Sequence, residues 1–257
     1  MIKLCLTLNL IVLSIISNAQ IETDRPGNTI IPQTVLKKWL QFETGFLLQT
    51  EKVVPPNSDL FIQHPSLLAK YGLGKRIEIR LITELSTIKE KDLNKVTTFS
   101  GINTFQLGGK FNFLNEKGVR PKISLIAHYS FNGLRTIVKG KDSIDGVYFR
   151  FAMQHTVTDN FIIGYNIGMQ WMRFGSPQAY LYTFSPKFNI NENWQVFLEL
   201  YGYAWKKRTP QNSIDGGISY FINDNFKIDA AAGFGLNKNA PDKFYALGLS
   251  YRFKVSK

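Results

Sequence analysis

Residues 161–171 read FIIGYNIGMQW, and apolar and polar side chains alternate along the run. The odd-numbered positions carry large apolar side chains, whereas glycine or polar side chains occupy the even positions from Gly164 to Gln170. A period of two is typical of a β-strand whose two faces meet different surroundings. The run has the length of a transmembrane strand, and it ends on an aromatic residue, Trp171.

The same alternation recurs from residue 39 to the C-terminus and predicts twelve strands. Their expected spans are 39–50, 63–71, 76–88, 103–114, 120–131, 147–157, 161–172, 178–189, 194–204, 213–222, 226–235 and 243–253. Short connections rich in Asn, Asp and Gly alternate with longer ones, as expected of antiparallel hairpins joined by tight turns at one end.

A soluble β-sandwich also has alternating strands, but its strands are usually about five or six residues long. Here the runs are longer and even in number. Trp39 and Trp194 begin strands at the short-turn side, and Trp171 and Trp205 end strands at the other. Lipid cannot satisfy backbone polar groups, so a sheet in a membrane must close on itself. We therefore predict an all-β fold: a transmembrane antiparallel up-and-down β-barrel of about twelve strands, spanning residues 39–257, with its short turns in the periplasm.

Residues 1–19 have the features of a signal peptide: Lys3 near the start, an apolar stretch over 4–16, and small residues up to Ala19. We expect cleavage after Ala19 and a location in the bacterial outer membrane of a Gram-negative cell. The alternative is a buried strand or helix of the mature fold. Cys5, the single Cys of the chain, would leave with the signal peptide.

Residues 20–38 lack a clear strand pattern, and Pro26 and Pro32 cannot donate to a sheet ladder. We interpret this N-terminal segment as lying in the lumen or beneath it in the periplasm. In the lumen, Asp24 and Arg25 would act as a plug by pairing with charged side chains of the wall. The alternative is a disordered periplasmic tail.

If the apolar positions face lipid, the charged residues of the opposite alternation line the lumen. The basic ones are Lys70, Arg80, Lys110, Lys122, Arg150, Lys187, Lys227 and Arg252, and the acidic ones are Glu43, Glu78, Glu84, Glu199, Asp215 and Asp229. This mixture of signs favours a structural network of ion pairs. The alternative is a permeation path lined by the same charges and by His128.

The whole chain has 31 Lys and Arg against 19 Asp and Glu, a net charge of +12. Because the lumen set is near balance, the excess is expected on the long outer loops. The basic loop residues would be Lys89, Lys91, Lys95, Arg135, Lys139, Lys141, Lys206, Lys207 and Arg208. We expect outer-membrane lipids and a small-molecule solute as partners, and no nucleic acid. The pattern leaves the oligomeric state open.

The blocks TDRP at 23–26 and LQFETGF at 40–46 resemble the start of mature proteins in a family described as transporter, or MetA-pathway of phenol degradation. The similarity continues in order along the mature chain. Its later blocks are LLAKYGL at 67–73, IEIR at 77–80, FRFA at 149–152, LELYG at 198–202, DGG at 215–217 and INDN at 222–225. The resemblance implies an outer-membrane barrel that passes small solutes, including hydrophobic or aromatic ones.

An enzyme is the second hypothesis, because residues 128–133, HYSFNG, resemble the His-x-Ser-Asn-Gly stretch of outer-membrane phospholipase A, with Phe131 inserted before Asn132. His128 and Ser130 share one face of a strand, so the imidazole could act as a base for the hydroxyl. The alternation places both inside the barrel, however, whereas a lipid-acting hydrolase needs its nucleophile at the lipid. A sealed structural barrel is the third hypothesis. Three dispersed His residues predict no metal site, and we expect no cofactor.

Overall fold

The computed structural model describes residues 20–52, 58–92, 95–137 and 144–255. The signal peptide predicted for residues 1–19 lies outside these ranges, as do Lys139 and Lys141.

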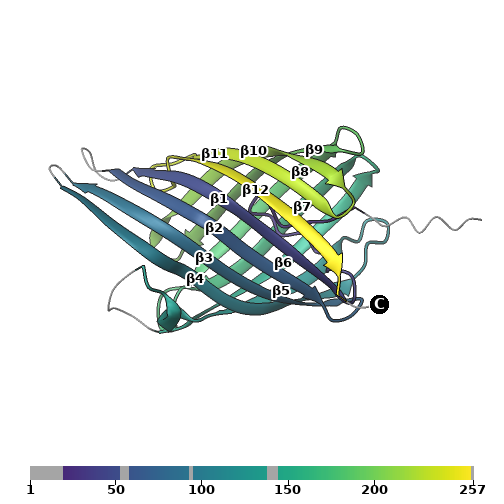
Figure 1. Cartoon of the computed structure of the whole chain (residues 1–257), viewed down its shortest axis with the longest axis horizontal. Coiled ribbons are helices and arrows are strands. Elements are labelled where there is room, and N and C mark those ends of the chain that lie inside the picture. The colour runs from purple at the N-terminus through teal and green to yellow at the C-terminus, as the bar shows by residue number, and fades with distance from the viewer. Residues whose placement is uncertain (1–19, 53–57, 93–94, 138–143, 256–257) are drawn as a thin grey trace, which may run out of the picture.

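Twelve antiparallel strands follow one another around a closed barrel, and β12 pairs with β1 to complete it (Figure 1). The elements are β1 (Trp39–Lys52), β2 (Ser58–Gly72), β3 (Ile77–Asp92), β4 (Lys95–Leu114), β5 (Lys122–Ser130), the 3-10 helix η1 (Asn132–Leu134), β6 (Gly146–Thr158), β7 (Phe161–Trp171), β8 (Ala179–Asn189), β9 (Trp194–Trp205), β10 (Arg208–Asn223), β11 (Phe226–Gly235) and β12 (Lys243–Lys254). The prediction of a twelve-stranded up-and-down barrel is confirmed.

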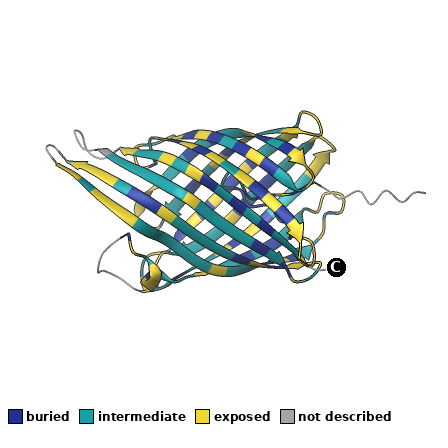
Figure 2. Cartoon of the chain, in the orientation of Figure 1, coloured by how far each residue is buried: buried dark blue, intermediate teal, exposed yellow. Residues whose placement is uncertain are grey.

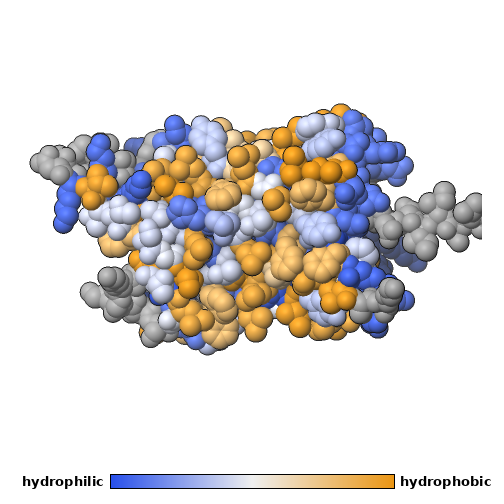
Figure 3. All heavy atoms as spheres, in the orientation of Figure 1, coloured by the Kyte–Doolittle hydropathy of each residue, from blue (hydrophilic) through white to orange (hydrophobic). Residues whose placement is uncertain are grey.

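Burial alternates along the strands as the sequence pattern predicts (Figure 2). In β5, Ser124, Ile126 and His128 are buried inside the barrel, whereas Tyr129 is exposed outside it. On the face shown in Figure 3, apolar side chains form a broad band, with hydrophilic side chains towards both ends. Within the described residues, no helix is long and apolar enough to cross a membrane.

Two ends of the barrel can be distinguished by their connections. The short-turn end carries the connections 73–76, 115–121, 159–160, 190–193 and 224–225, and β12 also ends there (Figure 1). The long-loop end is opposite, and there β1 to β4 extend beyond the other strands (Figure 1).

The prediction of long loops was wrong for parts of this end. β3 continues to Asp92 and β4 begins at Lys95, so Lys89, Lys91 and Lys95 lie in strands, and Arg208 begins β10. Backbone N–H and C=O groups pair in a hairpin whether or not its side chains are apolar. A strand extension without an apolar face therefore shows no alternation of apolar and polar residues, and the alternation was the basis of the prediction. Arg135 follows η1 in a connection, and Lys206 and Lys207 form the turn between β9 and β10.

Candidate functional site

Residues 20–37, here called the inner segment, fold as a loop inside the barrel. The segment begins at the short-turn end, where Ile21 N donates to Asp224 O at 2.8 Å. It returns to the same end, where Lys37 forms a bridge with Gly72. Between these points its residues contact inward side chains of most strands, as described below. The inner segment therefore occupies the lumen towards the short-turn end.

Wall glutamates accept hydrogen bonds from backbone N–H groups of the inner segment. Asn28 N and Thr29 N each donate to Glu199 at 2.6 Å, Asp24 N and Arg25 N each donate to Glu43 Oε2 at 3.0 Å, and Val35 N donates to Glu78 at 2.7 Å. An irregular segment cannot pair its own backbone groups, and irregular backbone at membrane depth needs partners in the protein. The glutamates supply acceptors for five of these donors.

Wall cations bind the carbonyl groups of the same segment. Lys110 Nζ donates to Ile31 O at 2.9 Å and to Gln33 O at 3.0 Å, Arg150 Nη1 donates to Asn28 O at 2.6 Å, and Lys227 Nζ donates to Arg25 O at 2.9 Å. The two kinds of charged lumen residue thus bind different backbone groups of the inner segment. Carboxylates accept from its N–H groups, and cations donate to its carbonyl groups.

Uncharged wall residues that the sequence reasoning missed also hold the segment. The Asn166 side chain accepts from Ile30 N at 2.8 Å and donates to Ile30 O at 2.9 Å. Ser124 donates to Pro32 O. The only sign of Asn166 and Ser124 in the sequence was that each occupies an inward-facing position of its strand.

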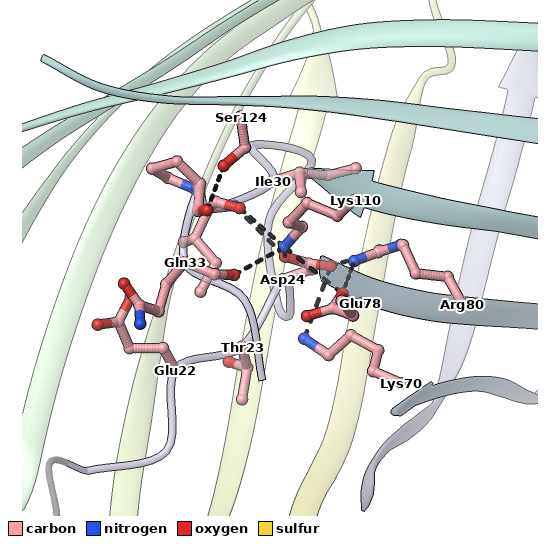
Figure 4. Close-up of polar contacts among 12 residues, drawn as sticks. Glu22, Thr23, Asp24, Ile30, Gln33, Lys70, Glu78, Arg80, Lys110 and Ser124 are labelled. Atoms are coloured by element: carbon pink, nitrogen blue, oxygen red, sulfur yellow. Dashed lines mark hydrogen bonds and ion pairs between the residues drawn. The ribbon is translucent and has the colours of Figure 1, made fainter. Parts of the chain in front are cut away.

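Asp24 lies at the centre of a buried cluster of ions (Figure 4). Its carboxylate accepts from Arg80 Nη2 at 2.5 Å, and the Nζ atoms of Lys110 and Lys70 lie 3.6 and 3.7 Å away. Arg80 also binds Glu78 at 2.7 Å, and Lys70 pairs with Glu43. We call Asp24, Glu43, Glu78, Lys70, Arg80 and Lys110 the Asp24 cluster. Its three acidic and three basic groups cancel, as buried charges require.

Arg25 makes a second contact with the wall. Its Nη2 binds Asp229 Oδ1 at 3.1 Å, and its guanidinium lies over Gly45 and Gly248, which face each other across β1 and β12. A Cβ at Gly45 would lie 2.5 Å from Arg25 Cζ. The paired glycines therefore form a recess for this side chain.

The remaining lumen candidates lie apart from these clusters. Asp215 is opposite Glu199 on β10 and accepts from Asn28 Nδ2 at 3.4 Å, and Lys122 binds Gln33. Glu84 accepts from Thr104 at 2.7 Å, above the inner segment. Arg252 donates to Asn225 at 3.0 Å and covers Trp39 at the short-turn end. Lys187 is partly buried on β8.

His128 and Ser130 do not form a catalytic pair. The His128 imidazole accepts from Arg80 Nε at 3.1 Å and stacks on Tyr148, whereas Ser130 donates to Asn132 Oδ1 at 3.1 Å. Both belong to the inward alternation of β5, away from the lipid-facing side. The arrangement does not favour the lipid-acting hydrolase.

A cavity of about 120 Å³ lies next to His128 on the long-loop side of the inner segment. Its lining comes from β4 to β7 and from the connection that contains η1, and it includes Gln106, Arg135, Tyr148 and Gln170. We call it the outer cavity. Its position follows from the ends of β5 and β7 and the start of β6, which all lie at the long-loop end. A second, open hollow of about 420 Å³ lies at the same rim beside Trp205 and Arg208.

A family model described as "Putative MetA-pathway of phenol degradation" matches residues 23–253. A search of curated proteins finds no match. An outer-membrane channel from Pseudomonas putida F1 superposes with a TM-score of 0.66 at 11% identity, over 90% of this chain and 100% of the other.

Two further channel structures have the same architecture. The CymD monoaromatic hydrocarbon channel has a TM-score of 0.50 at 9% identity, over 86% of this chain and 89% of its own. The KdgM porin has a TM-score of 0.51 at 11% identity, over 83% and 99%. The fold is therefore one that outer-membrane channels use.

Proposed function

Because the chain belongs to the family described as "Putative MetA-pathway of phenol degradation", we propose that it is a passive channel of the bacterial outer membrane for small solutes, including hydrophobic or aromatic ones. The observation that carries the proposal is a closed barrel with an apolar outer band and a polar inner face that surrounds a cavity. A barrel of this kind satisfies its backbone in lipid and keeps a polar interior for passage.

The location is part of the same proposal. The outer surface offers lipids an apolar band, and aromatic residues stand at both ends of the barrel: Trp171 ends β7 at the long-loop end and Trp194 begins β9 at the short-turn end. Export would follow cleavage of the signal peptide after Ala19. The short-turn end would face the periplasm.

The inner segment is the proposed plug of this channel. It fills the lumen towards the short-turn end, and its backbone is held by wall side chains on many strands. A solute that enters at the long-loop end would meet the Asp24 cluster before it reached the periplasm. Passage then requires the segment to move aside, so we expect the intact protein to conduct ions poorly.

Removal of residues 21–36 from the full chain tests this proposal in planar lipid bilayers. We expect the single-channel conductance to rise severalfold, because the deletion frees the part of the lumen that the segment fills. Solute flux into liposomes should rise in parallel. A folded deletion variant with unchanged conductance would overturn the plug. A variant and a parent that both pass no solute would indicate a sealed structural barrel instead.

A further inference from the structure

We propose that the outer cavity is a binding site for a small aromatic carboxylate of the benzoate type. The ring would lie against Tyr148 and the carboxylate against Arg135. This inference rests on the proposed channel function and gives it a substrate class and a place of entry.

The size of the outer cavity suits one ring. Its volume is about 120 Å³, and an apolar protein cavity of roughly 150 Å³ is known to hold benzene. The cavity opens towards the long-loop end, so a ring substituent has room there. A sugar of several residues would not fit inside it.

The charge of the lining favours an anion. Arg135 is the only Arg or Lys among the described residues that line the cavity, and none of these residues carries a carboxylate. The Glu84 carboxylate lies outside the lining, where it accepts from Thr104 at 2.7 Å and attracts Arg135. Arg135 Nη2 donates to Asn103 Oδ1 at 3.2 Å, but its Nε has no partner within the described part of the chain. A guanidinium presents several donors in a planar fork, and this geometry is well suited to a carboxylate.

His128 adds a second donor next to the cavity. Arg80 cannot accept a hydrogen bond, so the Arg80–His128 contact places the imidazole lone pair on Nε2 and the proton on Nδ1. Nδ1 is buried and has no acceptor among the described residues. An unpaired donor beside the cavity favours a ligand that brings oxygen acceptors.

Aromatic and apolar groups complete the lining. The Tyr148 ring stacks on His128 with centroids 4.7 Å apart. Trp171, at the end of β7, and the next residue, Met172, also line the cavity. Arg150 lies 5.6 Å from the Tyr148 ring on the side of the inner segment. Because His128 and Arg150 already lie against the Tyr148 ring, a bound ring would meet its edge, and the cation at the rim matches a ligand ring that carries one carboxylate.

Isothermal titration of the full mature chain in detergent tests the site with benzoate, acetate and benzyl alcohol. We expect benzoate to bind roughly tenfold or more tightly than either of the others, since acetate lacks the ring and benzyl alcohol lacks the charge. Arg135→Gln should weaken benzoate binding about tenfold and leave benzyl alcohol unchanged. Arg208→Gln at the second hollow is the matched control and should bind benzoate normally.

Equal binding of benzoate by the parent and Arg135→Gln would overturn the carboxylate site, as would equal affinity for acetate. Gel electrophoresis checks that each variant folds. The unheated, folded barrel should migrate faster than the same chain after it has been unfolded by heating. Liposome flux of a neutral solute is measured in parallel. Flux through the variant lacking residues 21–36 without benzoate binding by the parent refutes this inference alone. Benzoate binding by the parent without any flux through that deletion variant refutes the channel function and keeps the site.

Discussion

At the residue scale, Asp24 is the point where the inner segment and the wall depend most on each other. Its carboxylate is surrounded by Arg80, Lys70 and Lys110, all buried. Removing one partner of a buried ion cluster leaves the opposite charges uncompensated, which costs more than the pairing itself contributes. The segment should therefore be sensitive to loss of this single negative charge.

We expect Asp24→Asn to loosen the inner segment. A hydrogen bond to a charged group contributes about 1.5–3 kcal/mol, which corresponds to a roughly tenfold or greater rise in the open population. The measurement is the rate at which a water-soluble maleimide labels Thr34→Cys, a buried position of the segment. Glu84→Gln is the control, because Glu84 binds Thr104 on the wall. Equal labelling rates for Asp24→Asn and the parent would contradict the expectation.

The recess under Arg25 gives a second prediction. A Cβ at Gly248 would overlap the Arg25 guanidinium, so Gly248→Ala should displace this side chain and weaken its 3.1 Å ion pair with Asp229. Labelling of Thr34→Cys should again become faster. Gly74→Ala is a suitable comparison, since a Cβ there meets no atom within 4 Å. Faster labelling in both variants would mean that the loss of glycine, and not the recess, is responsible.

At the element scale, the strands and the inner segment differ in how far the sequence could predict them. The inward positions of Arg80 and His128 follow from a local period of two, so the barrel and its lumen face were predictable. The path of the inner segment was not, because Asn28 meets Glu199 171 positions away and only closure of the barrel brings them together. Asn166 escaped attention for the same reason: an uncharged inward side chain gives no sign of what it binds.

The long hairpin of β3 and β4 gives a prediction at this scale. Its outer part carries exposed charges such as Lys89 and Glu90, and it extends beyond the neighbouring strands. Replacing residues 89–98 by Asn-Gly joins Ile88 to Phe99, which are partners in the ladder. We expect the variant to fold and to unfold within a few degrees of the parent, as measured by the gel shift on heating.

The matching control keeps almost the whole β3–β4 hairpin but shifts the pairing of β3 with its neighbouring strands by one residue. Deleting Leu81 alone moves every later residue of β3 to the opposite face, so charged side chains would turn to lipid. This variant should fail to fold. If the shortened hairpin failed as well, the outer part of β3 and β4 would be needed for closure of the barrel.

At the scale of the whole molecule, the net charge of +12 is distributed over two places, the lumen and the long-loop rim, and the two affect a passing ion differently. Inside the lumen, the eight basic and six acidic side chains of the wall nearly balance, so they leave little net field for a passing ion even when the inner segment is removed. At the long-loop rim, Lys206, Lys207 and Lys238 are exposed. Their field reaches about one Debye length, which is about 10 Å in 0.1 M salt and about 3 Å in 1 M.

Ion selectivity of the variant lacking residues 21–36 should therefore depend on salt. We expect a modest preference for chloride over potassium in dilute KCl, seen as a reversal potential across a concentration gradient, and its near loss around 1 M because the rim charges are then screened. Lys206→Glu with Lys207→Glu should reduce the preference in dilute salt, whereas Lys75→Glu at the short-turn end should change it less. A preference that persists in concentrated salt would place the selecting charges inside the lumen, among the wall cations that the deletion leaves without the inner segment.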